Sequence, residues 1–209
     1  MNSLSRFISV VFHPLMMPFL ATCILFNTGN YLSYTVSEGL QRFLYVIIFL
    51  CTYLLPATIA WMMRQRGWIK SMEMEDRRER HIPFLMTFTC YLGGVYLLNQ
   101  LPVSRLFGLT LTGASLAILL GFLINLRWKI SIHMIGIGGV MGLFSGFGRY
   151  FHLSSSTALV GLAVLAGIIG SARLQARAHT SAQVYMGFLT GFLAEAGFIS
   201  LIASRLMGL

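Results

Sequence analysis

Three short polar segments hold most of the side chains that could bind or transfer an anionic group, in a chain that is otherwise apolar. The segments cover residues 64–83, 127–133 and 173–183. Guanidinium and ammonium groups bind anionic oxygens, while an imidazole can act as a nucleophile or move a proton. The candidate residues, in chain order, are Lys70, Arg77, Ser131, His133, Arg173, His179 and Gln183.

The segment around His179 has the most regular spacing. Every fourth residue from this position is polar or small, giving the series His179, Gln183, Gly187 and Gly191. Residues at this spacing share one face of a helix. Such a face could present an imidazole at a membrane surface, hold it with an amide one turn deeper, and pack closely below through its glycines. The alternative is a packing helix with an interfacial histidine.

The other two segments are less regular. Ser131 and His133 stand at the start of a glycine-rich run, where the N–H groups of a helix N-terminus could hold a phosphate oxygen. The glycines of this run follow no strand, so they indicate close helix packing rather than a dinucleotide site. Lys70 precedes Arg77 by seven residues in a stretch rich in acidic side chains. The alternative for that stretch is a solvated helix with paired charges.

The composition excludes an ordinary water-soluble globule. The 209 residues include 15 Lys and Arg and 6 Asp and Glu, 56% are hydrophobic, and the mean hydropathy is +0.77, whereas a soluble domain is about a quarter charged. We expect one membrane-embedded domain over residues 1–209. The net charge of +9 is attributed to loops beside anionic lipid headgroups rather than to nucleic acid binding. Cys23, Cys51 and Cys90 lie in separate apolar runs, which indicates neither a disulfide framework nor a zinc site.

The apolar runs predict an all-α, polytopic membrane bundle. Seven runs approach the length of about 20 residues that a span needs: 7–26, 43–63, 84–101, 107–126, 132–148, 157–172 and 184–206. The fifth and sixth are short, so six spans is the alternative. The first run is interpreted as a retained helix because it lacks a cleavage site of small residues.

With seven spans, the three polar segments all lie on the face that carries the N-terminus. Eleven basic residues then lie on this face and four on the other. The positive-inside rule places the richer face in the cytoplasm, in a multi-pass protein of the cell (inner) membrane. Trp61, Trp68 and Trp128 fall at span ends on the same face, as an interfacial belt would.

The order and spacing of these candidates resembles the type 2 phosphatidic acid phosphatase superfamily of membrane lipid phosphatases. Its motifs are K-x6-R-P, then P-S-G-H, then S-R-x5-H-x3-D. Here Lys70 and Arg77 keep the first spacing, with Arg78 in place of proline, and the second motif keeps Ser131 and His133 without its proline and glycine.

The third motif matches best. Arg173 is followed after five residues by His179 and after three more by Gln183, where the family has aspartate. The continuation VYMGFLTG is similar to the V-x2-G-x3-G that often follows that aspartate. The resemblance covers roughly residues 70–191.

The resemblance implies a phosphatase that works through a phosphohistidine and needs no metal or cofactor. His179 would attack the phosphorus, His133 would protonate the leaving oxygen, and Gln183 would orient His179. The residues that would hold the phosphoryl oxygens are Lys70, Arg77, Ser131 and Arg173. A neutral Gln183 accepts the orienting hydrogen bond but supplies no negative charge.

The resemblance leaves the substrate and the side of the membrane open. A glycerolipid, polyprenyl or lipid A phosphate would suit an apolar site mouth equally. Family members commonly carry the site on the periplasmic or lumenal face, opposite to the face that the basic residues indicate. Two other functions remain: a pseudoenzyme that binds lipid phosphate without hydrolysis, and a small lipid transporter marked by Glu195 in the last span. The expected partners are a lipid phosphate and membrane lipids.

Overall fold

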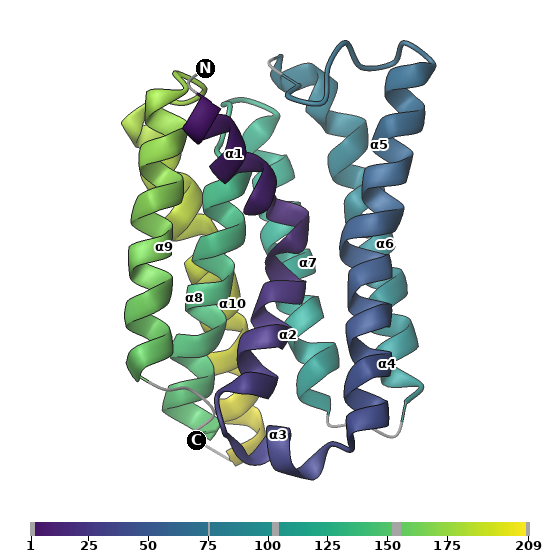
Figure 1. The fold of residues 1–209 in the computed structure, drawn as a ribbon, viewed down its shortest axis with the longest axis vertical. Coiled ribbons are helices and arrows are strands. Elements are labelled where there is room, and N and C mark those ends of the chain that lie inside the picture. Colours follow the sequence, from purple (N-terminus) through teal and green to yellow (C-terminus); the bar gives the residue numbers. More distant parts are fainter. Residues whose placement is uncertain (1–2, 75, 102–104, 152–155, 208–209) are drawn as a thin grey trace.

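The computed structural model describes residues 3–74, 76–101, 105–151 and 156–207, and every regular element in these ranges is a helix. In chain order the helices are α1 (Ser3–Val11), η1 (Pro14–Met16), α2 (Met17–Asn27), α3 (Tyr31–Thr35), α4 (Glu38–Phe49), η2 (Leu50–Leu54), α5 (Leu55–Gln65), η3 (Arg77–Arg80), α6 (His81–Asn99), α7 (Arg105–Asn125), α8 (Ile132–Phe151), α9 (Ser156–Gln175) and α10 (Ser181–Met207). The long helices stand side by side as one bundle (Figure 1). The expected all-α fold is confirmed.

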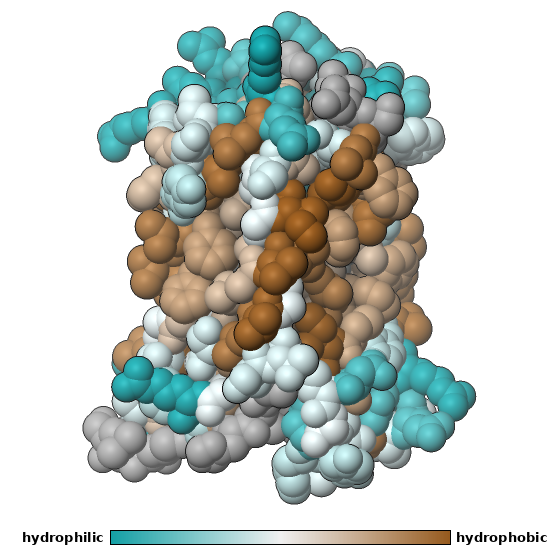
Figure 2. Space-filling view, turned by 60° about the vertical axis from the view of Figure 1, so that its left-hand side comes forward, coloured by the Kyte–Doolittle hydropathy of each residue, from teal (hydrophilic) through white to brown (hydrophobic). Residues whose placement is uncertain are grey.

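Six helical segments of the described chain are long and apolar enough to cross a membrane. They are Leu4–Asn27, Glu38–Gln65, Arg77–Asn99, Arg105–Asn125, Ser156–Gln175 and Ser181–Arg205. Figure 2 shows the corresponding surface, with hydrophobic residues in a central belt and hydrophilic residues at both ends. The protein is therefore a multi-pass membrane protein.

A seventh long helix, α8, lies inside the bundle. Most of its residues are buried, and Phe144 and Phe147 are fully enclosed. Because protein rather than lipid covers this helix, its glycine-rich sequence does not need the apolarity of a lipid-facing span. It runs opposite to both α7 and α9 (Figure 1), and it is not among the six segments that are apolar enough to cross a membrane.

Close contact between α8 and α10 depends on glycine. A Cβ atom on Gly138 would overlap the carbonyl oxygen of Phe188, and one on Gly191 would overlap the carbonyl oxygen of Ile135. The two backbones therefore touch without intervening side chains. This confirms the close packing that the glycine spacing predicts in both helices.

We expect Gly191→Ala to lower the free energy of unfolding of the detergent-solubilised protein by about 1 to 3 kcal/mol, because the added methyl group would force α8 and α10 apart. Gly197→Ala, on the same helix, is the matched control, since nothing lies within 4 Å of a Cβ atom at Gly197. The control should leave stability unchanged or raise it by up to about 1 kcal/mol through the better helix propensity of alanine. Thermal unfolding measures both, and equal stability of the two variants would contradict the packing.

The second pass contains a π-helical turn, η2, which ends two residues before Pro56. Leu55 N–H donates to Leu50 O, five residues back, instead of forming the usual α-helical bond. Tyr53 in this turn lies against His13, which precedes η1, with ring centroids 6.1 Å apart. The first two passes therefore meet through polar aromatic side chains.

The three polar segments meet at one end of the bundle, together with the N-terminus (Figure 1). Arg80 Nη1 donates to Ile130 O at 3.2 Å, and Ser131 N–H donates to Gln183 O at 3.4 Å. These bonds join segment 64–83 to segment 127–133, and segment 127–133 to segment 173–183. The prediction that the three segments share one face is confirmed.

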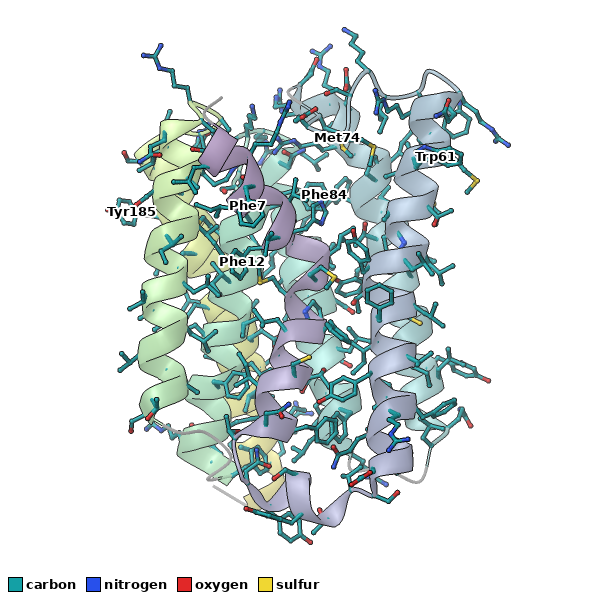
Figure 3. The ribbon with its side chains drawn as sticks, viewed as in Figure 1. Phe7, Phe12, Trp61, Met74, Phe84 and Tyr185 are labelled. Atoms are coloured by element: carbon teal, nitrogen blue, oxygen red, sulfur yellow. The ribbon has the colours of Figure 1, made fainter. Side chains whose placement is uncertain are left out.

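Tryptophan side chains surround this end of the bundle. Trp61, Trp68 and Trp128 are all exposed, and Figure 3 shows Trp61 pointing away from the helices. Indole rings favour the boundary between lipid tails and headgroups. The polar end is therefore the end at which a membrane interface meets the protein, as expected from the positions of the three tryptophans.

Candidate functional site

Five polar side chains that could do chemistry are buried or half-buried together at this end. Arg80 ends η3, Ser131 directly precedes α8, His133 lies in its first turn, Arg173 lies in the last turn of α9, and His179 lies between α9 and α10. All but the half-buried Arg173 are fully buried. The site is thus assembled from the ends of several passes.

His179 is held by Gln183, and the bond fixes which ring nitrogen carries the proton. His179 Nδ1 lies 3.1 Å from Gln183 Oε1, and the same oxygen accepts a hydrogen bond from Thr180 N–H at 3.2 Å. Because a backbone N–H can only donate, the Gln183 atom beside it is the amide oxygen. That oxygen accepts from Nδ1–H, so Nε2 of His179 keeps its lone pair.

The surroundings of His179 favour the neutral imidazole. The pKa of His179 is lowered to about 3, mainly by burial. The hydrogen bond with Gln183 raises the pKa, and the positive charges of Arg80 and Arg173 lower it further. The ring is therefore unprotonated at neutral pH, and its Nε2 lone pair is available as a nucleophile.

The lowered pKa predicts that His179 makes stability sensitive to acid. In the unfolded chain His179 titrates near 6.5, so between pH 6.5 and about 3 the unfolded state binds a proton that the folded state does not. The contribution of His179 to the free energy of unfolding is therefore fully present above pH 6.5. It falls by about 2 kcal/mol between pH 7 and pH 5. Unfolding of the wild type and His179→Asn at both pH values should show this additional loss in the wild type alone. An equal loss in both proteins would contradict the lowered pKa.

Ser9 of α1 connects His133 with Arg173. His133 Nε2 lies 3.1 Å from Ser9 O, and Arg173 Nη1 donates to Ser9 Oγ at 2.9 Å. Since a carbonyl oxygen only accepts, Nε2 of His133 carries the proton and Nδ1 carries the lone pair. His13 packs edge-on against His133, with ring centroids 5.9 Å apart. The first pass therefore completes one side of the site.

Arg80 is the second cation of this group. Its side chain is 4% exposed, its Nε donates to Met74 O at 2.8 Å, and its Nη1 donates to Ile130 O. Its charge acts on both His179 and Arg173. The charges of two guanidinium groups therefore act on the imidazole, although the sequence motif singles out Arg77 of the same turn rather than Arg80.

Arg77 and Lys70, which the sequence motif places in the site, lie elsewhere. Arg77 Nη1 donates to the backbone oxygens of Asn125 and Leu126, so it caps the C-terminus of α7. Lys70 is exposed, and its backbone N–H donates to Glu79 Oε2 at 3.2 Å. In the geometry of the site, Arg80 therefore replaces Arg77.

Four atoms of the group are buried without a hydrogen-bond partner in the described part of the chain. They are Ser131 Oγ, His133 Nδ1, Arg173 Nε and His179 Nε2. Leaving a buried polar atom unpaired costs about 1 to 3 kcal/mol, so such atoms rarely gather without a reason. Two of these atoms belong to donors, the Ser131 hydroxyl and the Arg173 guanidinium, and two are imidazole nitrogens with lone pairs. The donors suit an anion with several oxygens, such as a phosphate group.

No family model, no curated protein and no solved structure matches the chain. The chemistry of the site therefore rests on its own residues. Among the described residues, no group of three or more His, Cys, Asp and Glu side chains could hold a metal ion. The positive charge at the site comes from Arg80 and Arg173. Glu73 acts on Arg173 and lies 3.9 Å from Arg6.

A cavity of about 360 Å³ begins beside Arg80 and extends into the bundle. Glu73, Met74 and Arg80 line its polar end, and Glu195 of α10 lines it further inside. Figure 3 shows Met74 and Phe84 in the space between α1–α2 on one side and α5–α6 on the other. Most of the remaining lining is apolar, so the cavity can hold a hydrocarbon chain beside a polar group.

Ser9, His13 and Arg80 are site residues that the sequence motifs missed. A signal for the first two was present, because Ser5, Ser9 and His13 recur every four residues in an apolar first pass. Nothing in the sequence separates Arg80 from its basic neighbours. Its burial follows from the short helix η3, which begins where Asp76 accepts a hydrogen bond from Arg78 N–H.

Proposed function

We propose that the protein removes the phosphate group of a lipid phosphate in the cell (inner) membrane through a phosphohistidine on His179. The observation that carries this proposal is the state of His179. Its Nδ1–H is bound to Gln183, and its buried Nε2 has no partner among the described residues and lies close to two arginines. A neutral imidazole beside fixed cations is what attack on a phosphorus atom requires.

In the first step, the Nε2 lone pair of His179 attacks phosphorus and the P–O bond to the lipid alcohol breaks. Arg80, Arg173 and Ser131 stabilise the charge on the equatorial oxygens. His133, whose Nδ1 carries a lone pair, takes the proton of the lipid phosphate monoanion at Nδ1 and passes it to the leaving oxygen. Water then gives a proton to the same Nδ1 and attacks phosphorus, the N–P bond breaks, and inorganic phosphate leaves with that proton.

The proposal keeps the resemblance to the type 2 phosphatidic acid phosphatases with one change. Arg80 takes the role that the motif spacing gives to Arg77. The residue seven positions before Arg80 is Glu73 rather than a lysine, so the cations of the site are Arg80 and Arg173. The apolar cavity beside Arg80 supports a lipid rather than a water-soluble phosphate ester.

Gln183 favours a second candidate, a protein that binds lipid phosphate without turnover. Phosphorylation of His179 leaves a positive imidazole, which a carboxylate would stabilise and a neutral amide does not. The same arginines and Ser131 would bind the ligand in either case. The two functions differ only in whether the N–P bond forms.

The test is release of inorganic phosphate by the purified, detergent-solubilised protein from phosphatidic acid, a polyprenyl phosphate and a lipid A phosphate. We expect steady release from at least one of them, together with an acid-labile phosphoprotein when the reaction is quenched early. Tight binding of all three without release would support the second candidate. Neither binding nor release would reject both functions.

A further inference from the structure

We propose that Glu195 binds a hydroxyl or amide N–H group on the hydrocarbon part of the lipid phosphate, about 12 Å from the phosphorus atom. This rests on the proposed function for the position of the phosphate. It adds a determinant of substrate choice that lies in the interior of the bundle and has no part in the hydrolysis itself.

Glu195 is a buried residue whose carboxyl Oε2 has no hydrogen-bond partner among the described residues. Its side chain is 3% exposed, it lines the cavity, and its Oε2 accepts no hydrogen bond from any described residue. Taking a carboxyl group out of water without a partner costs several kcal/mol. A ligand that supplies a donor would remove this cost.

The helices around Glu195 leave room for its carboxyl group. A Cβ atom on Gly113 of α7 would overlap Glu195 Oε2, and a Cβ atom on Gly139 of α8 would lie 3.6 Å from Glu195 Cγ. The nearby hydroxyl of Thr110 already donates to Leu106 O at 2.8 Å, within α7. Its proton is therefore not available to Glu195.

The cavity that Glu195 lines also reaches Arg80, one of the two arginines of the proposed phosphate site. Gly139, which faces Glu195, lies eight residues after Ser131, a rise of about 12 Å along α8. The rest of the lining is largely apolar and includes Met17, Ala57, Ala60, Phe84, Ile118 and Val140. A ligand that reaches both ends therefore has a phosphate, a hydrogen-bond donor about 12 Å from the phosphorus atom, and hydrocarbon that packs against the apolar lining.

An acyl chain with a hydroxyl group near its ester bond has this pattern. The phosphate would lie between Arg80 and His179, the chain would follow the cavity, and the hydroxyl would donate to Glu195 Oε2. A plain acyl chain would leave the carboxyl group unpaired in an apolar surrounding. The protein should therefore prefer the hydroxylated ligand.

The probes for the test are 1-(3-hydroxytetradecanoyl)-glycerol 3-phosphate and 1-tetradecanoyl-glycerol 3-phosphate in the same detergent. Affinity is measured from the ligand-dependent rise in melting temperature of the His179→Ala protein, in which turnover is removed. We expect the hydroxylated probe to bind about 5-fold more tightly. Adding Glu195→Gln should keep this preference, because an amide oxygen also accepts. Adding Glu195→Leu should abolish it.

Equal affinity for the two probes, or a preference that survives Glu195→Leu, would overturn the inference. Phosphate release from the same probes by the protein with His179 intact separates this result from the proposed function. Phosphate release from both probes, with equal affinity for the two, would support the proposed phosphatase activity and reject the role of Glu195. Discrimination in binding without any release supports the role of Glu195 and rejects the phosphatase.

Discussion

Replacing His179 with alanine should lower the rate of lipid phosphate hydrolysis by about 10⁴-fold or more, because it removes the attacking Nε2 lone pair, on whose ring the charges of both Arg80 and Arg173 act. Lipid phosphate binding should persist, since the arginines and Ser131 remain. The measurement is phosphate release at saturating substrate, with melting temperature as the check on folding.

Gln183→Asp is the companion change. It keeps an oxygen acceptor for Nδ1–H of His179 and adds negative charge behind the imidazole that becomes positive on attack. The rate should stay the same or rise. Hydrolysis that continues unchanged in His179→Ala would reject the phosphohistidine, whatever the effect of the aspartate.

Arg80→Ala should reduce kcat/KM by roughly 10² to 10³-fold, because it removes a fixed, buried cation from the oxygens on which charge develops. Arg77→Ala is the matched control, three residues away in the same turn. Its guanidinium caps α7, so its loss should lower stability by about 1 kcal/mol while kcat/KM changes little.

The two arginine variants test which residue is the site cation: Arg77, which the motif spacing predicts, or Arg80, which the geometry of the site indicates. If Arg77→Ala were the inactive variant and Arg80→Ala the active one, the assignment of the site cation would be reversed. Phosphate release and thermal unfolding on the same preparations distinguish a catalytic loss from a folding loss. Arg80→Lys should recover part of the rate, because it restores the charge without the planar fork of donors.

Apolar runs predict the membrane-spanning helices of this chain well, because a helix that faces lipid must be apolar over the thickness of the hydrocarbon core. The predicted run 43–63 lies within the helical segment Glu38–Gln65, which continues past the apolar part at both ends. Hydropathy detects only the part of a helix that meets lipid tails, so polar residues such as Gln41 and Arg42 in the first turns of α4 were outside the prediction.

The site was harder to predict because burial, rather than residue type, decides which cations belong to it. The candidate residues of segments 127–133 and 173–183 lie together at one end of the bundle, as predicted; they are Ser131, His133, Arg173, His179 and Gln183. Arg77 and Arg80 are chemically the same, and only the direction of the short helix η3 separates a cap on α7 from a buried cation. That direction depends on contacts with chain segments far away in the sequence.

The contacts of Ser9 set the moment at which the site can exist during synthesis. Ser9 precedes His133 by 124 residues and Arg173 by 164 residues. At about 5 to 20 residues per second, the ribosome finishes α9 roughly 8 to 30 s after the first pass. Until then the Ser9 hydroxyl can bond within its own helix, as it does to Ser5 O. A growing chain therefore carries no assembled site, and the group around Ser9 forms only when the last helices have joined the first.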